Sequence, residues 1–418
     1  MLRRRGNFYW GQYTIFSRVQ SFAGLLIVAA AFAIVAVCGF LPASGLRSQD
    51  PAPADFNTFY AAGQCYRQGL DPGDFDSYSK LYEQYEGRPA DAPWFYPPQA
   101  APFVLLLALF PPRAAMLLLA LANLAAALAL AWLTLRWVTQ ARPLRPVSHW
   151  PLTLWLLPAV ALATPAVTHW IKSGQVTLLA AALIFAGWLA ARSRRDLLAG
   201  LLFGLAAFKP QFVVLTLLWF LLERRWLLLV ATLAVTAALS IPSSLQLGFC
   251  HGLTAFLGNL HLHGRQPLNQ LGNGLVMGLP SLLAAVGLPM PSPLALLAAA
   301  ALLVVGLWTM RRHLSPDSLP GLVLGVQLIF AYGKYADMVL LLPLAAGLWL
   351  LAGHRRSSWP WLLAGTLLAW TPTRVFIAAG HPEWQHIKMI AFVAGLVALF
   401  ALALRPESPK IKDLSSTS

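Results

Sequence analysis

Long runs of apolar residues, rich in Leu and Ala, recur along almost the whole 418-residue chain. A water-soluble domain cannot bury so many apolar side chains. About a quarter of the residues in such domains are charged, whereas the charged share here is 11%. A lipid bilayer accepts this surface, and about 20 apolar residues suffice for a helix to cross it. The runs lack the period of two that barrel strands require, so the pattern predicts an all-α polytopic membrane protein.

The spacing of the runs predicts a single domain over residues 1–418 with about 12 transmembrane helices. The expected spans include residues 151–169, 226–247 and 359–377. A shorter apolar run at 97–110 is expected to be re-entrant or a short half of a bundle. The first run, residues 21–42, is interpreted as a retained span, because no small-residue cleavage site separates it from the rest of the chain. Clusters of Arg lie between later runs, and the positive-inside rule assigns those ends to the cytoplasm. The rule accounts for the net charge of +15 without a nucleic-acid partner. We expect a multi-pass protein of the cell (inner) membrane with both termini inside, including a tail at 405–418.

The sequence changes character between residues 44 and 99. This segment is polar and aromatic, and it contains eight of the 15 acidic residues of the chain. Connections of this length are usually functional, and the alternation of Arg clusters places this one outside the cell. We therefore expect a long first extracytoplasmic loop. It contains Cys65, for which a disulfide with Cys250 is one alternative that the sequence does not require.

Isolated charges at the ends of apolar runs form a second group, expected on the same outer face. A charged side chain at the centre of a membrane helix costs roughly 2.5–3.5 kcal/mol, so such residues are functional candidates. Lys209 is the clearest, because it lies at the tip of a hairpin formed by residues 197–208 and 211–222. It either binds an anion or extends to the outer headgroups. The others are Lys172, Arg265, Lys334, Asp337, Arg374 and Lys388.

Three further motifs are candidates for a site on this face. Asp55 follows the first run, where it serves either as a helix N-cap or as a general base. The stretch 94–98 (Trp-Phe-Tyr-Pro-Pro) forms either an aromatic interface belt or a wall for a sugar or prenyl chain. Amides that can hold sugar hydroxyls occur at Gln175, Asn269 and Gln270. The paired histidines at 261–263 and 381–386 lack the spacing of a known ligand set, so no metal is expected.

These pieces, in this order, resemble glycosyltransferase family 87, membrane α-mannosyltransferases with the GT-C fold. The resemblance covers roughly residues 55–351. Its matching positions are Asp55, Phe56, Tyr60, Gly63, Gly69, Asp71, Pro72, 95–98, 174–175, Gly200, Gly204, 209–210, 269–270 and 335–337. Two positions depart from the family pattern. The aromatic residue of the turn after Gly69 is displaced to Phe75, and residues 331–335 lack the histidine that some members carry there.

The resemblance implies a hexosyltransferase without a cofactor, which moves a sugar, often mannose, from a polyprenyl-phosphate donor to a lipid or glycan acceptor outside the cell. Asp55 is then the expected general base of an inverting displacement, and Lys209, with Lys334 or Arg374, is expected to hold the phosphate. The remaining expected binding residues are Arg265, Tyr60, Tyr96, Gln175, Asn269, Gln270 and Asp337. Two other classes stay open: a transporter or flippase, since intramembrane charges also mark transport sites, and a structural subunit of an envelope-polysaccharide complex.

Overall fold

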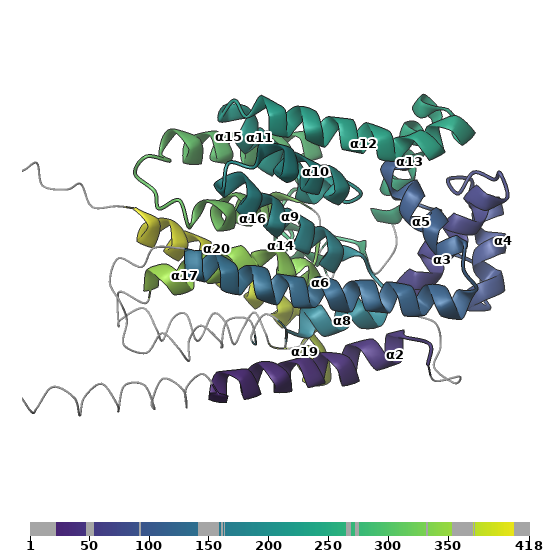
Figure 1. The fold of residues 1–418 in the computed structure, drawn as a ribbon, viewed down its shortest axis with the longest axis horizontal. Coiled ribbons are helices and arrows are strands. Elements are labelled where there is room, and N and C mark those ends of the chain that lie inside the picture. Colours follow the sequence, from purple (N-terminus) through teal and green to yellow (C-terminus); the bar gives the residue numbers. More distant parts are fainter. Residues whose placement is uncertain are drawn as a thin grey trace, which may run out of the picture.

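The computed structural model of the chain is helical almost throughout, as the apolar pattern predicts (Figure 1). It describes residues 22–46, 54–91, 93–140, 159, 162, 164–264, 269–271, 276–331, 333–352, 371 and 373–404. Within these ranges, strands β1 (Val276–Met277) and β2 (Gly333–Lys334) pair antiparallel and form the one small sheet. The predicted all-α class is therefore confirmed.

The segment between residues 44 and 99 folds into two helices that follow the first apolar helix, Phe22–Ala43. That first helix ends with η1 (Ala36–Phe40) and α2 (Leu41–Ala43), and the next two are α3 (Ala54–Arg67) and α4 (Phe75–Glu86). The carboxylate of Asp74 accepts a hydrogen bond from the Ser77 N–H and starts α4. At its other end, Gly87 adopts the left-handed conformation that ends many helices, with φ 76°. Most of the segment is thus an ordered helical layer.

This helical layer is joined to the bundle through an aromatic core and a close helix contact. Phe59, Trp94 and Tyr96 pack edge to face or stacked, with ring centroids 4.7–5.8 Å apart. Next in the chain come η2 (Pro98–Ala100) and α5 (Ala101–Ala108), so the short run predicted near 97–110 is a short helix. Gly63 of α3 lies against α5, where a Cβ atom would overlap the Val104 carbonyl oxygen. A glycine is needed because the two backbones meet there.

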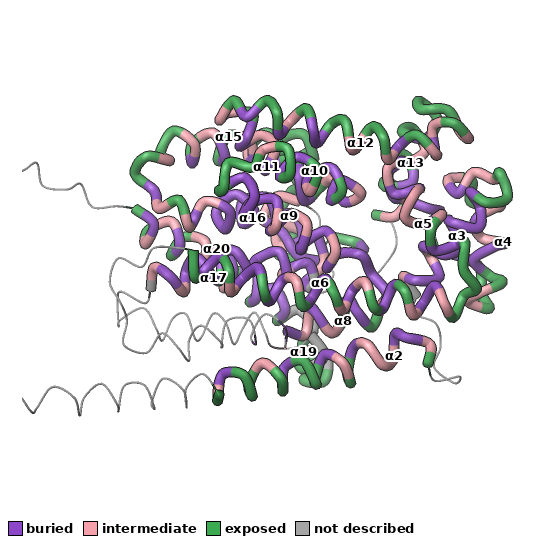
Figure 2. The backbone as a smooth tube through the Cα atoms, in the orientation of Figure 1, coloured by how far each residue is buried: buried purple, intermediate pink, exposed green. Residues whose placement is uncertain are grey.

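The central bundle is built around a buried helix. Its elements are α6 (Pro112–Gln140), α8 (Pro165–Ser173), α9 (Thr177–Arg192), α10 (Asp196–Ala206), η3 (Pro210–Phe212), α11 (Val214–Leu222) and α12 (Trp226–Leu247). Helix α9 is buried along most of its length, whereas α12 has a largely exposed outer face (Figure 2). Gly200 and Gly204 allow α10 to approach α12, because a Cβ at either position would overlap that helix.

The C-terminal part adds a second group of helices to the bundle. They are α13 (Phe249–Gly264), α14 (Leu279–Ala285), α15 (Pro293–Thr309), α16 (Leu319–Phe330), η5 (Tyr335–Leu341), α17 (Leu342–Ala352), α19 (Thr373–Ala378), η7 (Pro382–Gln385) and α20 (His386–Ala403). The β1–β2 pair places Val276 opposite Lys334. This pairing ties the chain after α13 to the start of η5, where two of the predicted site residues lie.

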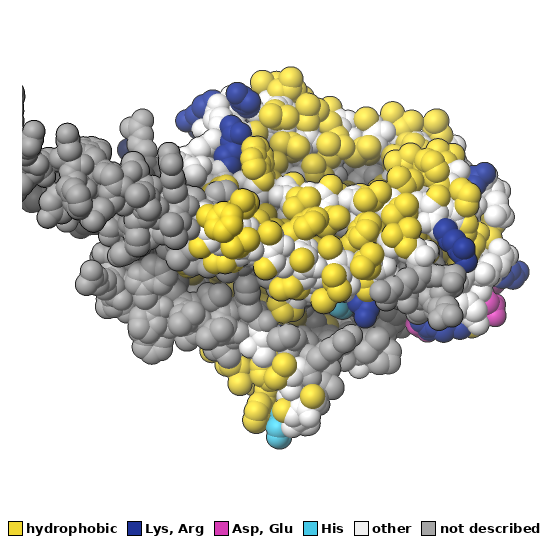
Figure 3. Space-filling view, turned by 60° about the horizontal axis from the view of Figure 1, so that its bottom comes forward, with side chains coloured by type: hydrophobic (Ala, Val, Ile, Leu, Met, Phe, Trp, Pro, Cys, Tyr) yellow, Lys and Arg dark blue, Asp and Glu magenta, His cyan; other side chains and the backbone are white. Residues whose placement is uncertain are grey.

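Four described helices are long and apolar enough to cross a bilayer: Phe22–Ala43, Pro112–Gln140, Trp226–Leu247 and His386–Ala403. Six further apolar helices in the described part have between 10 and 17 residues. One face of the protein carries a broad hydrophobic surface, on which the Lys and Arg side chains gather toward the ends (Figure 3). A membrane protein is thereby supported. The expected number of about 12 crossings stays a prediction, as does the side on which each terminus lies.

One alternative predicted from the sequence is wrong, and several predicted residues lie outside the described ranges. Cys65 is buried, Cys250 is exposed and both are free, so the alternative of a disulfide between them is wrong. The tail 405–418, Arg265 and most of the spans expected at 151–169 and 359–377 lie outside the described residues.

Candidate active site

Asp55 lies in the first turn of α3, next to the C-terminal end of α8. Helix α3 begins at Ala54, so Asp55 is inside the helix and the alternative of an N-cap role is wrong. The Ser173 side chain is a hydrogen-bond partner of its carboxylate. After Ser173 the chain turns at Gly174, whose φ of 73° is left-handed and favours glycine. This turn directs the next residue, Gln175, toward the same region.

The ammonium group of Lys209 lies inside the protein, between α10 and η3. Only 7% of this residue is exposed, and its Nζ donates a hydrogen bond of 2.7 Å to Thr177 Oγ1 at the start of α9. The rings of Tyr96, Trp170 and Phe212 surround Nζ, with centroids 5.5–5.9 Å away. Such contacts stabilise a cation without neutralising it. Lys209 does not extend to the surface, so the alternative of a headgroup contact is wrong.

Lys334 and Asp337 bring a second cation and a second carboxylate to this region. The backbone N–H of Lys334 donates a 2.8 Å hydrogen bond to the Asp337 carboxylate, which fixes the start of η5. Asp337 is 5% exposed and interacts with the Thr177 side chain and the charge of Lys209. The charges of Lys334 and Lys209 also act on Asp55. Asp55, Lys209, Lys334 and Asp337 therefore form one cluster of charges, which we call the four-charge cluster.

Tyr96, in the aromatic motif at 94–98, lies against the four-charge cluster. Trp94 and Tyr96 are 3% and 8% exposed, so they face inward and the alternative of a lipid-facing belt is wrong for them. The Tyr96 hydroxyl donates a 2.8 Å hydrogen bond to Gln175 Oε1. Since Gln175 Oε1 also accepts from the Val176 N–H, the amide is held in one orientation. Tyr96 and Gln175 thus flank the cluster, and their role in binding a substrate stays a prediction.

A comparison with protein-family models finds one family, glycosyltransferase family 87, over residues 94–332. The match covers more than half of the chain. The protein belongs to glycosyltransferase family 87. Comparison with curated proteins and with solved structures gives no match. The matched stretch includes Tyr96, Gln175 and Lys209, whereas Asp55 precedes it and Lys334 follows it.

The other predicted site residues of this family 87 protein are not shown next to the four-charge cluster. Tyr60 is five residues after Asp55, which turns it well away around the helix. Its hydroxyl donates to the Phe110 carbonyl at 2.8 Å and its ring packs on Tyr85. Asn269 is buried beside His263, where its Nδ2 lies 3.2 Å from both the carbonyl oxygen and Nδ1 of that histidine. Gln270 is exposed. Arg374 belongs to α19, but its side chain lies outside the description, as does Arg265.

Three residues at the site are absent from the catalytic and binding residues that the sequence predicts. Ser173 and Thr177 flank the Gly174–Gln175 motif, and a turn that places Gln175 in a site also brings its polar neighbours there. His263 stacks on Phe95 with ring centroids 3.6 Å apart. Burial and the charges of Lys334 and Lys209 lower the pKa of His263 to about 4, so its imidazole is neutral at pH 7. In the sequence it is one of the paired histidines at 261–263, a spacing that carries no signal for this role.

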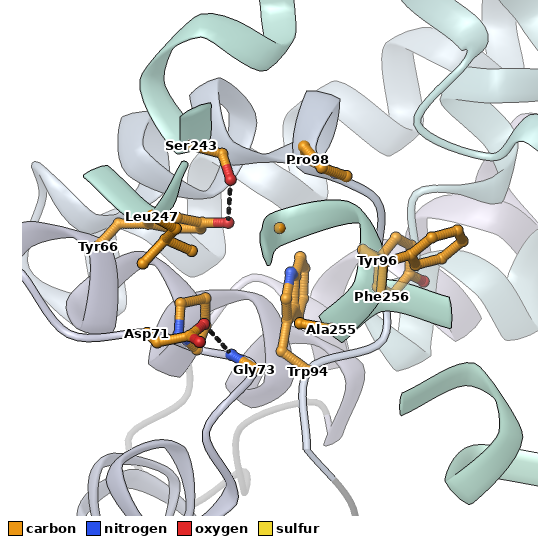
Figure 4. Close-up of a pocket in the computed structure, with 12 residues that line it drawn as sticks. Tyr66, Asp71, Gly73, Trp94, Tyr96, Pro98, Ser243, Leu247, Ala255 and Phe256 are labelled. Atoms are coloured by element: carbon orange, nitrogen blue, oxygen red, sulfur yellow. Dashed lines mark hydrogen bonds between the residues drawn. The ribbon is translucent and has the colours of Figure 1, made fainter. Parts of the chain in front are cut away.

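A small hollow lies between the helical layer of residues 44–99 and the corner formed by α12 and α13 (Figure 4). Its volume is about 10 Å³, and Tyr96 and Trp94 form part of its lining. The Tyr66 hydroxyl lies 3.3 Å from Ser243 Oγ on its wall. A cavity of this size holds about one water molecule. It cannot accept a sugar. It is a small packing gap between the helical layer and the bundle.

The electrostatics of Asp55 suit a proton acceptor. Helix α3 is outside the candidate membrane spans, and Asp55 is partly buried there. Burial raises the pKa of Asp55 above its ordinary value, while the positive charges of Lys334 and Lys209 offset part of the rise. A carboxylate with a raised pKa is a stronger base, and the charges of the two lysines favour its ionised form. The cluster thus combines a base with two cations.

Proposed function

We propose that this family 87 glycosyltransferase moves a hexose, with mannose as the expected sugar, from a polyprenyl-phosphate donor to a lipid or glycan acceptor on the extracytoplasmic face. One observation carries the proposal. The carboxylate of Asp55 lies in one cluster with two lysines, one of them the buried Lys209. Transfer from a sugar phosphate needs a base for the incoming hydroxyl and positive charge for the departing phosphate.

The proposed reaction is a single inverting displacement. Asp55 accepts the proton of the acceptor hydroxyl as its oxygen forms the new bond to the anomeric carbon. The bond from that carbon to the donor phosphate oxygen breaks at the same time, and the electron pair leaves with the polyprenyl phosphate. Lys209 and Lys334 stabilise the negative charge that grows on this phosphate. Because phosphate is a good leaving group, the mechanism requires no separate general acid.

The sidedness of the proposal rests on the distribution of charge along α9. This helix begins at Thr177, in contact with Lys209, and ends at Arg192. Arg194 and Arg195 follow directly, and Arg clusters mark cytoplasmic ends by the positive-inside rule. The four-charge cluster is at the opposite end of the helix. We therefore propose that the reaction takes place on the extracytoplasmic side.

A transporter or flippase of a lipid-linked anion is the other class that the charges alone would fit. Membership of a glycosyltransferase family favours the enzyme. A transport site also has no need of a base, whereas Asp55 interacts here with the charges of two lysines.

The function is tested with the purified full chain in liposomes, given radiolabelled polyprenyl-phosphate mannose and extracted membrane lipids. We expect label to move into a new lipid or glycan product, and polyprenyl phosphate to be released in equal amount. Counterflow of intact donor across the liposome membrane without product formation would support the transporter instead. A panel with glucose and galactose donors identifies the hexose.

Removal of Lys334 is expected to move the acid limb of the pH–rate profile to higher pH. Asp55 acts as a base only when ionised, so the rate falls as the pH drops through its pKa. Lys334 contributes the largest of the charge effects that lower this pKa. In Lys334→Ala the pKa of Asp55 therefore rises, and protonation inactivates the enzyme at a higher pH. The measurement is kcat/KM for the donor against pH.

The matched control for this experiment is Lys172→Ala. Lys172 is an exposed lysine one residue before Ser173, and it is absent from the charges that act on Asp55. Its removal should leave the acid limb in place. An acid limb that is equal in wild type and in Lys334→Ala would rule out Asp55 as the titrating base next to Lys334, even if the overall rate fell.

A further inference from the structure

A second cavity lies at the end of the bundle that is opposite the four-charge cluster. Its volume is about 200 Å³, and its lining comes from α6, α9, α11 and the chain around Pro316–Pro320. Helix α9 connects the two places, because Thr177 touches Lys209 and Arg192 lines the cavity. At 1.5 Å per residue the helix separates them by roughly 22 Å. The proposed transfer reaction makes no use of this cavity.

Aromatic rings and arginines share the lining of this cavity. Trp137, Trp188 and Trp219 supply the rings, from three different helices. The guanidinium of Arg192 lies over the Trp137 ring, 4.8 Å from its centroid. Stacking of this kind fixes the plane of the guanidinium, so that its N–H groups bind partners in that plane. Here Nη1 of Arg192 already pairs with Asp317. A planar set of donors at the mouth of an aromatic pocket suits a phosphate group.

The balance of charge around the cavity is positive. Arg225 is held by Asp196 and by the Ala191 carbonyl, and Arg192 pairs with Asp317 at 2.6 Å. Glu223 also lines the cavity and is a hydrogen-bond partner of Trp219. Six arginines lie on the lining or next to it, whereas the carboxylates there number three. The arginines are at positions 192, 194, 195, 224, 225 and 311. The excess is three positive charges. Of the four arginines outside the two Asp pairs, Arg194 lines the cavity and also acts on Glu223, together with Arg311.

Arg194 has an unusual backbone at the rim of the cavity. Its φ of 57° is in the left-handed region, where glycine is ordinarily preferred. Its N–H bonds the Ala191 carbonyl at 3.1 Å and closes the end of α9. The side chain is exposed and lines the cavity. Arg224 has the same φ at the turn before α12, so the conformation belongs to these short turns. At Arg194 the turn places a guanidinium at the cavity mouth.

The surface next to the cavity is apolar, which identifies the kind of molecule that could reach it. The Arg225–Asp196 pair stands at the start of α12 and α10. The residues after each partner are exposed: Leu197 is 54% exposed, Trp226 59% and Leu227 57%. In a membrane protein such side chains contact acyl chains, and Trp is typical of the headgroup level. A ligand with an anionic head and an apolar tail would contact both surfaces.

We propose that this cavity binds the phosphate headgroup of an anionic phospholipid of the membrane. Arg192 and Arg194 contact the phosphate, the tryptophan wall contacts the glycerol region, and the acyl chains lie along α10 and α12. Such a lipid would connect α9 to α11 and to the start of α16, which the cavity separates. Its expected effect is to stabilise the bundle rather than to take part in sugar transfer.

The test uses the full chain purified in detergent, with melting temperature and native mass spectrometry as readouts. Phosphatidylglycerol should raise the melting temperature of the wild type and remain bound in the spectrometer, whereas phosphatidylcholine should do neither. In Arg194→Gln the apparent dissociation constant for phosphatidylglycerol should rise about tenfold, as expected for one lost charged hydrogen bond. Arg194 forms no ion pair among the described residues, so this variant should fold as the wild type does.

Arg312→Gln is the matched control, since Arg312 is exposed among the same arginine clusters and does not line the cavity. It should keep the wild-type response to phosphatidylglycerol. An equal loss in both variants would indicate a general charge effect and overturn the proposal. An unchanged response in Arg194→Gln would also overturn it. Stabilisation by soluble glycerol phosphate as strong as that by phosphatidylglycerol would do the same, because the ligand would then be a free phosphate ester.

Discussion

Asp55→Asn is expected to fold normally and to lose glycosyl transfer by about 10³-fold, within the range that positioned general bases supply. Asparagine has nearly the same shape as aspartate and can still accept a hydrogen bond from the Ser173 side chain, so the first turn of α3 should persist. It cannot take up the proton of the acceptor hydroxyl. The measurement is kcat for transfer from polyprenyl-phosphate mannose, together with the melting temperature of the purified protein.

Asp74→Asn serves as the matched control for this substitution. Asp74 belongs to the same helical layer, and its exposed side chain caps α4 through the Ser77 N–H. Asparagine caps helices about as well as aspartate, so both stability and transfer should stay near the wild-type values. Turnover close to normal in Asp55→Asn would show that the base is another group. The cluster contains only one other carboxylate, Asp337, which would then be the residue to test.

Lys209→Met should lower kcat/KM for the polyprenyl-phosphate donor by about 100-fold. Methionine fills a similar space among Tyr96, Trp170 and Phe212 but carries no charge. A buried charged hydrogen bond to the donor phosphate contributes about 2–3 kcal/mol, which corresponds to this factor. The largest part of the loss should appear in kcat, because the phosphate becomes most negative as it leaves. Steady-state kinetics with varied donor concentration measures both parameters.

Lys172→Met provides the comparison for Lys209→Met. Both lysines belong to the group of isolated charges expected at the outer face, but Lys172 is exposed at the end of α8 whereas Lys209 is buried. Its substitution should change neither kcat nor KM. If Lys209→Met retained both constants, Lys209 would have no part in holding the phosphate, and its burial would serve the packing of α9 against η3 alone.

The sequence predicted the helical elements well, because their signals are local. The apolar run at 226–247 coincides with α12, and the hairpin of 197–208 and 211–222 corresponds to α10 and α11 with Lys209 at the tip. A helix in lipid satisfies its own backbone hydrogen bonds, so its length and apolar composition are sufficient to locate it. The two helices of the 44–99 segment were harder to foresee, since their stability comes from an aromatic core made by residues far apart in the chain.

The partners of a single side chain were harder to predict, because they depend on the tertiary packing around it. Asp55, Lys209, Tyr96 and Gln175 are expected at a site from the cost of burying charge and from the family pattern, and the structure brings them together. Tyr60 fits the same pattern, yet the helical turn directs it to Phe110. A periodic pattern gives the face of a helix, whereas the partner on that face depends on the packing of the whole bundle.

The sequence by itself determined that this chain is a helical membrane protein in which an isolated charge near the bundle interior is a candidate for function. Only the tertiary structure decided which of those charges meet. Asp55, Lys209 and Lys334 come from separate elements, and no local rule brings them near each other. They converge because α3, α8, α9 and η5 pack at one end of the bundle, where the low polarity around Lys209 makes a neighbouring carboxylate favourable. Long-range packing is the physical origin of the site.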